Sequence, residues 1–305
     1  METKKIGVFG NPPEDLAGSP PGATQYSPLF PGADSLENCA PQTVSAMTML
    51  APGGTIDRRY TLALALRTLA PHGTLTVMAP KDKGGSRLKK ELTEFGCEVS
   101  EEAKSHHRIC VCRPPENMHS PALENALQEG ASHFLEEIGL WTQPGVFSWN
   151  RHDLGSSLLL EHLPALAGVG ADLGCGIGFL SRNILQSKKV KHLTMLDIDR
   201  RAIECAQKNL GEKRVTLQWA DLRTAALPAN LDFVVTNPPF HDGGIEDQSL
   251  GQAFLKRGAE ILRQGGSCWL VANRHLPYEA ILRSFFGEVK LVAEQSGFKI
   301  YEAKK

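Results

Sequence analysis

Residues 171–180 read Ala-Asp-Leu-Gly-Cys-Gly-Ile-Gly-Phe-Leu, and this stretch decides the fold. An apolar run ends there as a strand, three glycines spaced by single residues form a turn, and Phe179 begins a helix. Glycines let the backbone pass close to a ligand, and the N-terminus of a helix favours electron-rich groups. The dinucleotide-binding fingerprint Gly-x-Gly-x-x-Gly fits poorly, because the third glycine, Gly178, comes one residue early.

Two carboxylates follow the turn at distances that suit a nucleoside. Asp197 lies 23 residues after Gly174, at the end of the apolar run 192–196. A carboxylate at the tip of the second strand can accept both hydroxyl groups of a ribose. Asp221 closes the third strand, where it can accept the amine of an adenine. We therefore expect a ligand that contains adenosine.

The sequence Asn237-Pro238-Pro239-Phe240 follows the apolar run 231–236. Two prolines fix φ and remove two backbone donors, so this turn offers carbonyl oxygens and the Asn237 side-chain oxygen as acceptors beside an aromatic face. Such a site suits an exocyclic amine on a stacked base, or an amide. The plain alternatives are an Asn-Pro bend for Asn237 and core packing for Phe240.

In this order, these motifs resemble class I S-adenosylmethionine-dependent N-methyltransferases. Further stretches are similar to the bacterial ribosomal RNA guanine-N2 methyltransferases, especially the enzyme that acts on small-subunit (16S) rRNA. They are Asn-Pro-Pro-Phe-His-Asp-Gly at 237–243, Val-Ala-Asn-Arg-His-Leu-Pro-Tyr at 271–278 and Pro-Gly-Val-Phe-Ser at 144–148. The resemblance is strong over residues 144–305 and looser over the first half.

The resemblance implies methyl transfer from S-adenosyl-L-methionine to the exocyclic N2 of a guanine in ribosomal RNA, with S-adenosyl-L-homocysteine as product and no metal. The expected substrate is 16S rRNA or the small subunit. The residues expected to bind the cofactor are Asp172, Gly174, Gly176, Gly178, Asp197, Ile198, Asp221, Leu222 and Asn237. The residues expected to hold and stack the target base are Asn237, Pro238, Pro239 and Phe240. His241 is left outside this set.

Three classes of alternative remain open. Residues 271–276 are as similar to a group that methylates guanine N2 in large-subunit 23S rRNA. Enzymes that methylate adenine N6 in DNA, or a glutamine amide in peptide release factors, also use Asn-Pro-Pro and an aromatic residue, but commonly have Tyr where this chain has Phe240. A ribosome assembly factor that binds RNA without turnover is the third alternative.

Length and composition set further limits. A chain of 305 residues with 41% hydrophobic content is long enough for two domains. The net charge of −1 gives no overall attraction to RNA, so RNA must contact local basic patches. Seven cysteines without paired spacing argue against a disulfide framework, and no run is long and apolar enough for a membrane span. We expect a cytoplasmic monomer.

The two halves share a pattern. Residues 69–81 run in step with residues 262–274, and each stretch predicts a helix end, a glycine, a buried strand and a polar exit. Only 68 residues precede Leu69, without a glycine loop, so we expect the first half to be a degenerate copy that lacks a cofactor site. Asn11-Pro12-Pro13 is interpreted as an ordinary proline turn, since Glu14 stands where an aromatic would stack.

We therefore predict an α/β protein with two Rossmann-like, class I methyltransferase-type domains. The first, over 1–130 with a connector near 116–140, is the degenerate duplicate, and it binds substrate RNA or supports the fold. Its basic run over 81–90 is a candidate phosphate contact or a solvated helix face. The second, over 131–305, is catalytic and has a doubly wound, mostly parallel sheet with a terminal antiparallel hairpin.

The elements expected in the catalytic domain alternate along the chain. Strands are predicted at 168–173, 191–197, 214–219, 231–236 and 267–272, and the hairpin strands near 288–293 and 297–302. Helices are predicted at 178–187, 200–210, 248–264 and 277–286. Phe147 and the stretch 153–156 precede the first strand. The resemblance implies that this region covers the cofactor, whereas the sequence alone fits a packed entry loop equally well.

Overall fold

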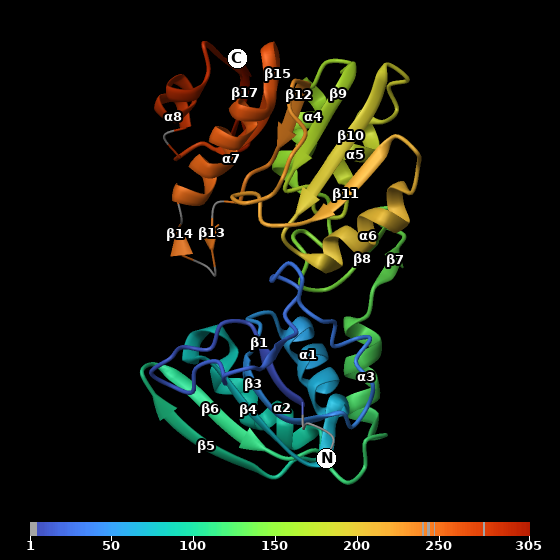
Figure 1. The fold of residues 1–305 in the computed structure, drawn as a ribbon, viewed down its shortest axis with the longest axis vertical. Helices are drawn as coiled ribbons and strands as arrows, with labels where there is room; N and C mark the ends of the chain where they lie inside the picture. Colours follow the sequence, from blue (N-terminus) through green and yellow to red (C-terminus); the bar gives the residue numbers. More distant parts are fainter. Residues whose placement is uncertain (1–4, 240, 243–244, 247, 277) are drawn as a thin grey trace. The chain divides into compact units, whose positions relative to one another are not determined.

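The computed structural model describes residues 5–239, 241–242, 245–246, 248–276 and 278–305. It forms two compact units (Figure 1). Unit 1 consists of Met1–Ser132 with Gln143–Gly145, and unit 2 of His133–Thr142 with Val146–Lys305. Phe240, predicted to stack on the target base, lies outside the described residues. Among the described residues, no helix has the length and apolar character needed to cross a membrane.

Unit 2 is built on a seven-stranded sheet with the order β11-β10-β9-β12-β15-β17-β16. The five strands from β11 to β15 run parallel, whereas β17 is antiparallel to both of its neighbours. The strands are β9 (Gly168–Leu173), β10 (Val190–Asp197), β11 (Val215–Trp219), β12 (Leu231–Thr236), β15 (Leu262–Asn273), β16 (Glu288–Gln295) and β17 (Phe298–Lys304). The predicted parallel sheet with a terminal hairpin is confirmed.

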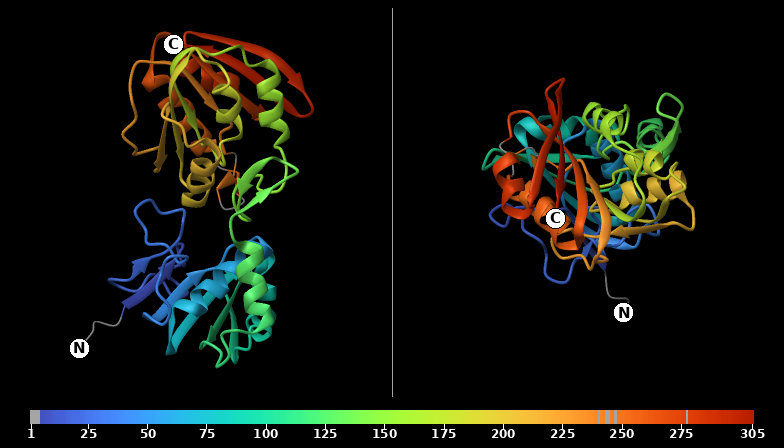
Figure 2. Two further views of the ribbon diagram at one scale, coloured as in Figure 1. Left: turned by 90° about the vertical axis from the view of Figure 1, so that its right-hand side faces the viewer. Right: turned by 90° about the horizontal axis from the view of Figure 1, so that it is seen from above.

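Helices cover both faces of this sheet (Figure 2). They are α4 (Leu154–His162), α5 (Phe179–Ile184), α6 (Arg200–Leu210), α7 (Gln248–Ile261) and α8 (Tyr278–Phe285). Successive side chains of a strand point to opposite faces, so the side chains of β12 pack into two hydrophobic cores, one on each face of the sheet. Phe233 and Val235 enter the core beside α4, α5 and α6, whereas Val234 enters the core beside α7 and α8. A strand buried on both faces explains the continuous apolar run 231–236.

Some element ends differ from the prediction. The helix expected over 248–264 ends at Ile261, and the strand expected over 267–272 begins at Leu262. The strand begins early because Leu262 pairs with Leu231, and a bulge then takes up 263–266 before Ser267 pairs with Phe233. The helix expected over 178–187 covers only Phe179–Ile184.

The stretches predicted as a connector and as an entry loop also contain regular structure. The connector region 116–140 holds α3 (Pro121–Gly130), β7 (His133–Leu135) and the first residue of β8 (Leu140–Thr142). The stretch 153–156 opens helix α4 instead of forming an entry loop. Asp153 caps this helix, since its Oδ2 accepts the Ser156 N–H at 2.7 Å.

Unit 1 contains a six-stranded sheet with the order β2-β1-β3-β4-β6-β5. Its strands are β1 (Lys5–Phe9), β2 (Thr24–Gln25), β3 (Val44–Leu50), β4 (Leu69–Pro80), β5 (Val99–Lys104) and β6 (His107–Cys112). Its helices are α1 (Thr55–Thr68), α2 (Ser86–Glu94) and α3, and the turn η1 (Lys81–Gly85) precedes α2. As in unit 2, the last two strands form an antiparallel hairpin on a parallel sheet.

The strand registers show that unit 1 is a copy of unit 2. In β4, Leu69 pairs with Val44, and after a bulge Thr74 pairs with Ala46. In β4 the chain thus advances five residues while β3 advances two. The same irregularity occurs in β15, which advances from Leu262 to Ser267 while β12 advances from Leu231 to Phe233. The glycines in these bulges have matching surroundings, since a Cβ at Gly73 or Gly266 would touch two backbone oxygens at 2.9–3.1 Å.

The copy has lost the polar residues of the site. Phe9 pairs with Met49 as Leu173 pairs with Thr236, and Gly7 pairs with Thr24 as Ala171 pairs with Thr194. In this register the counterparts of Asp172, Asp197 and Asn237 are Val8, Ser27 and Leu50. Unit 1 is therefore a degenerate methyltransferase-like domain.

A buried ion pair fills the corresponding corner of unit 1. The counterpart of Asn237-Pro238-Pro239 is Leu50-Ala51-Pro52, which precedes Gly53. The guanidinium of Arg58, of which 1% is exposed, donates to the Gly53 carbonyl at 2.8 Å and binds the carboxylate of Glu91 through two bonds of 2.7 and 2.8 Å. The turn that corresponds to Asn237-Pro238-Pro239 is thus followed by a carbonyl that is bound to a buried ion pair.

Candidate functional site

The predicted site residues of unit 2 stand at the carboxyl ends of neighbouring parallel strands. The chain leaves β9 at Gly174, β10 at Ile198 and β12 at Asn237, and these strands are adjacent in the sheet. Ligands of open α/β sheets bind outside these ends. The topology therefore brings together motifs that lie up to 63 residues apart in the sequence.

Asp172 presents an unpaired acceptor beneath the glycine turn. Its side chain is fully buried in β9, and Oδ2 accepts the hydroxyl hydrogen of Ser181 at 2.6 Å. Oδ1 is also buried and has no partner among the described residues. Burial raises the pKa of Asp172 to about 7. A buried acceptor without a partner is costly in the free protein and suits a ligand that donates a hydrogen bond.

The glycine turn leaves open space at its centre. Gly176 has a φ of +53°, and a Cβ there would meet no atom within 4 Å. At Gly178, with a φ of +88°, a Cβ would instead lie 2.6 Å from Cδ1 of Leu210 in α6. The chain thus needs Gly178 for the close packing of helices, whereas Gly176 keeps the backbone open to a ligand.

Asp197 supports the same turn. Its Oδ2 accepts the Gly176 N–H at 2.8 Å, and its Oδ1 accepts the Asp199 N–H at 2.9 Å. Burial raises the pKa of Asp197 to about 6, against the opposing effect of these hydrogen bonds. Each carboxylate oxygen has a further lone pair for a hydroxyl group. The next side chain, Ile198, is 39% exposed and offers an apolar surface.

Asp221 and Leu222, both predicted to contact the cofactor, have protein partners in the structure. The carboxylate of Asp221 binds the guanidinium of Arg223 at 2.6 Å, and this pairing holds the pKa of Asp221 below its usual range. Leu222 is buried in the core beneath α7. An amine at Asp221 would have to share the carboxylate with Arg223, and the cofactor contact predicted for Leu222 remains a prediction.

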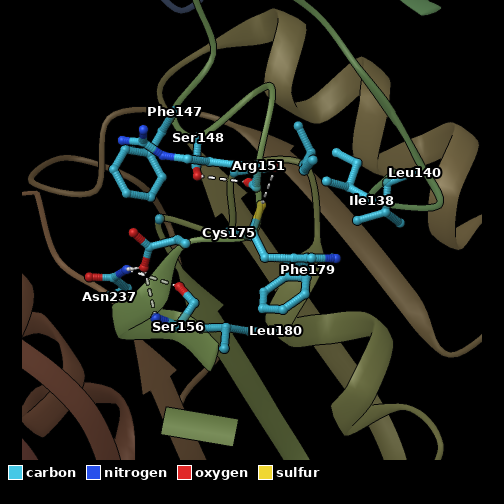
Figure 3. Close-up of a pocket in the computed structure, with 15 residues that line it drawn as sticks. Ile138, Leu140, Phe147, Ser148, Arg151, Ser156, Cys175, Phe179, Leu180 and Asn237 are labelled. Atoms are coloured by element: carbon cyan, nitrogen blue, oxygen red, sulfur yellow. Dashed lines mark hydrogen bonds between the residues drawn. The ribbon is translucent and has the colours of Figure 1, made fainter. Parts of the chain in front are cut away.

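The side-chain amide of Asn237 has a fixed orientation. Its Nδ2 donates to Oδ2 of Asp153 and to Oγ of Ser156, both at 2.9 Å. Its Oδ1 has no partner among the described residues and points away from these two groups (Figure 3). Pro238 is buried and Pro239 is half-buried. The turn thus presents the amide oxygen that the sequence predicts as an acceptor.

A pocket joins the glycine turn to Asn237 (Figure 3). Its lining includes Gly174–Ile177, Asn237 and several side chains of residues 147–156. Phe147 is 66% exposed, and the ring of His152 lies against that of Phe179 with 4.9 Å between centroids. Among the described residues, no group of three or more His, Cys, Asp or Glu side chains could hold a metal ion.

Asp153 and Ser156 line the pocket beside Asn237. The sequence predicts the stretch 153–156 as a cover over the cofactor or an entry loop, but not as a partner of Asn237. The sequence does contain a signal, since an Asp three residues before a Ser at the start of an apolar run is a helix-capping pattern. That pattern predicts α4 but does not reveal the contact with Asn237, which lies 84 residues from Asp153 in the sequence.

Comparisons with known proteins show the family of the chain. The model of the family "Methyltransferase small domain" matches residues 137–302. The ribosomal RNA small subunit methyltransferase C of Stutzerimonas stutzeri is 32% identical over 98% of this chain and 94% of its own. The protein of the same name from Shewanella baltica is 32% identical over 79% of this chain and 71% of its own.

A solved structure matches the whole chain. The 16S rRNA N2 G1207 methyltransferase of T. thermophilus, in complex with AdoMet and guanosine, superposes with a TM-score of 0.78. The match covers 100% of this chain and 89% of the other, at 24% sequence identity. The two methyltransferase-like domains are thus a shared fold. With the identity to its curated relatives, the chain belongs to the ribosomal RNA small subunit methyltransferase C family.

Proposed function

We propose that this protein transfers a methyl group from S-adenosyl-L-methionine to the exocyclic N2 of a guanine in 16S rRNA. The observation that carries the proposal is the side-chain amide of Asn237, which lines the pocket: its nitrogen donates both hydrogens to Asp153 and Ser156, so its oxygen is the part left to accept from a ligand. An acceptor fixed in this way selects a substrate group that carries hydrogen, such as an aromatic amine.

The small subunit is the favoured source of the substrate. Relatives that align over most of this chain are named for the small-subunit RNA, and the matching T. thermophilus enzyme is named for N2 of G1207. We propose the corresponding guanine as the target, in preference to a guanine of 23S rRNA. Since an RNA substrate of this kind is made in the cytoplasm, we propose that the protein works there, as a monomer.

The residues at the glycine turn suit the cofactor. The unpaired Oδ1 of Asp172 would accept from the methionine amino group, and the open backbone at Gly176 would let the ligand pass. Asp197 would accept the ribose hydroxyls, and Ile198 would lie against the adenine. When bound, S-adenosylmethionine supplies an activated methyl group, so the protein is left with positioning and desolvation.

The turn after β12 would orient the base. The Asn237 Oδ1 and the Pro238 carbonyl would accept the two N2 hydrogens, which turns the nitrogen lone pair toward the methyl donor. Phe240 would stack on the base, and a stacking contact of this kind contributes about 1–3 kcal/mol. The methylated nitrogen is acidic enough to release its proton without a strong base. The guanine must be unpaired or flipped out to reach the turn.

Unit 1 would contribute contacts with the RNA. Lys81, Arg87 and Lys89 are exposed around the start of α2, and each phosphate that they neutralise adds salt-dependent affinity. The net charge of −1 makes such a local patch necessary for RNA binding. Its counterparts of the site residues are Val8, Ser27 and Leu50, so we assign no methyl transfer to this unit.

A deletion strain tests the proposed function. We expect 16S rRNA from cells without the protein to lack one N2-methylguanosine, mapped by mass spectrometry of ribonuclease fragments. The wild-type gene and the surface variant Asn38→Ala should restore it, whereas Asn237→Ala should not, although calorimetry still detects S-adenosylmethionine binding. An unchanged methylation pattern in the deletion strain would refute the substrate assignment.

A further inference from the structure

We propose that Asp153 and Ser156 are positioning residues that hold the Asn237 amide so that only its oxygen is left to bind a ligand, and thereby set the preference for a base that carries an amine. We call Asp153, Ser156 and Asn237 the amide clamp. This inference rests on the proposed function, because it concerns how the same pocket selects its base.

The amide clamp uses both hydrogens of the Asn237 side chain. One bond of 2.9 Å leads to Oδ2 of Asp153 and another of 2.9 Å to Oγ of Ser156. Ser156 is 6% exposed, so its side chain has little freedom to turn away from Asn237. With both N–H groups engaged, the nitrogen of the amide has no hydrogen left for a ligand. The free oxygen is the part of Asn237 that can bind the substrate.

The chemistry of Asp153 makes this orientation unambiguous. An ionised carboxylate only accepts hydrogen bonds, so the amide atom beside Asp153 must be the nitrogen. A flipped amide would place its oxygen against the carboxylate oxygen and would lose both bonds of the clamp. The charge on Asp153 also strengthens the bond that it accepts. The residue thus acts through Asn237 without touching the substrate.

Helix α4 holds the carboxylate in place. Oδ2 of Asp153 also accepts the Ser156 N–H at 2.7 Å, which ties it to the first turn of the helix. A Cβ at Gly155 would lie 3.2 Å from this Oδ2 and 3.1 Å from Cε1 of Phe298. The absent side chain at Gly155 therefore leaves room for the carboxylate between the helix start and β17.

The clamp predicts a selectivity that can be measured with small ligands. A guanine donates its N2 hydrogens to the fixed oxygen, whereas a hypoxanthine has only a C–H at that position and leaves the oxygen unpaired. Sites built to bind a polar group discriminate strongly against an analogue that lacks it. If the amide were free to turn, its nitrogen would take the place of the oxygen part of the time, and the preference for guanine would fall.

The test compares variants that differ only in the clamp. Asp153→Ser keeps a residue that caps helices but is too short to reach Asn237, and Ser156→Ala removes the second acceptor. Ser157→Ala is the matched control, since its hydroxyl binds the backbone carbonyl of Asp153 and not Asn237. Each full-length protein is assayed for RNA methylation, for S-adenosylmethionine binding by calorimetry, and for competitive inhibition by guanosine and by inosine.

We expect the double variant Asp153→Ser/Ser156→Ala to lose on the order of 100-fold in kcat/KM, the loss typical of a misplaced reactive group. Its ratio of inosine to guanosine inhibition constants should fall toward one, while that of Ser157→Ala stays at the wild-type value. In an Asn237→Ala background the two substitutions should cost little more, since residues that act through one another are not additive.

Two results would overturn the inference. One is an unchanged inosine-to-guanosine ratio in the double variant, which would mean that the substitutions only perturb the helix. The other is a loss of the same size, about 100-fold, in the Asn237→Ala background. Wild-type protein that methylates no guanine would instead refute the proposed function, so the two failures can be told apart.

Discussion

Replacing Asp172 by asparagine should remove a large part of the pH dependence of unit 2. Asp172 is fully buried, and burial raises its pKa to about 7, against about 3.9 for an aspartate in an unfolded chain. The folded protein therefore keeps a proton that the unfolded chain has already released. A raised pKa of this kind stabilises the folded state in acid, and that stability is lost as the pH rises toward 7.

The size of the effect follows from the pKa values. Between pH 5 and pH 8 the unfolded carboxyl stays ionised, while the folded one loses its proton near pH 7. Two pKa units between 5 and 7 correspond to about 3 kcal/mol of lost stability. The asparagine of the variant would not titrate, so the free energy of unfolding of Asp172→Asn minus that of the wild type should be about 3 kcal/mol larger at pH 8 than at pH 5.

The four tryptophans allow the free energy of unfolding to be measured for unit 2 alone. Trp141, Trp149, Trp219 and Trp269 all belong to that unit, so urea unfolding followed by tryptophan fluorescence reports on it. Taking the variant–wild-type difference at each pH largely cancels the contribution of other groups. The control is Asp232→Asn, because Arg263 holds the pKa of Asp232 below its usual range and the group stays ionised throughout. A difference for Asp172→Asn that is equal at both pH values, or smaller at pH 8, would refute the reasoning.

Three further predictions concern packing and thiols. Gly178→Ala should destabilise unit 2 by about 1–3 kcal/mol, because its Cβ would lie 2.6 Å from Leu210 at a positive φ; an unchanged urea midpoint would contradict this. Glu91→Ala should destabilise unit 1 by about 3–5 kcal/mol, since it leaves the buried Arg58 unpaired, and hydrogen exchange in α1 should rise while the tryptophan signal of unit 2 stays the same. Thiol titration of the native protein should find one fast cysteine, Cys39, because the other six are buried; several fast thiols would argue against the packing described.

Much of the fold follows from local sequence. The strand 231–236 and the glycine turn after Leu173 are continuous stretches whose residue types allow few other structures. The alignment of the two halves can also be found from the sequence, because Gly73 and Gly266 are each the fifth residue of the similar stretches 69–81 and 262–274. What sets the ends of β15 is a bulge against the neighbouring strand, and pairing between strands leaves no mark in the residues themselves.

The site was less accessible to sequence reasoning. The acceptor role of Asn237 follows from its own tetrapeptide, but the groups that orient it lie 81 and 84 residues earlier. Asp221 illustrates the opposite case, since its partner Arg223 is only two residues away. From the sequence, a carboxylate at a strand end predicts a ligand contact. Whether a nearby arginine binds that carboxylate instead is visible only in the three-dimensional structure.

The narrow sheet of unit 1 bears on whether a cofactor site could be built there by substitution. In the part of the chain that the structure describes, this sheet stops at the two-residue strand β2, and no strand corresponds to β11. Acidic and amide side chains at Val8, Ser27 and Leu50 would therefore restore the counterparts of Asp172, Asp197 and Asn237 without any counterpart, among the described residues, of β11 and of Asp221 behind it. Substitutions at these three positions would not give unit 1 a cofactor site like that of unit 2, because its described sheet also lacks the strand that corresponds to β11.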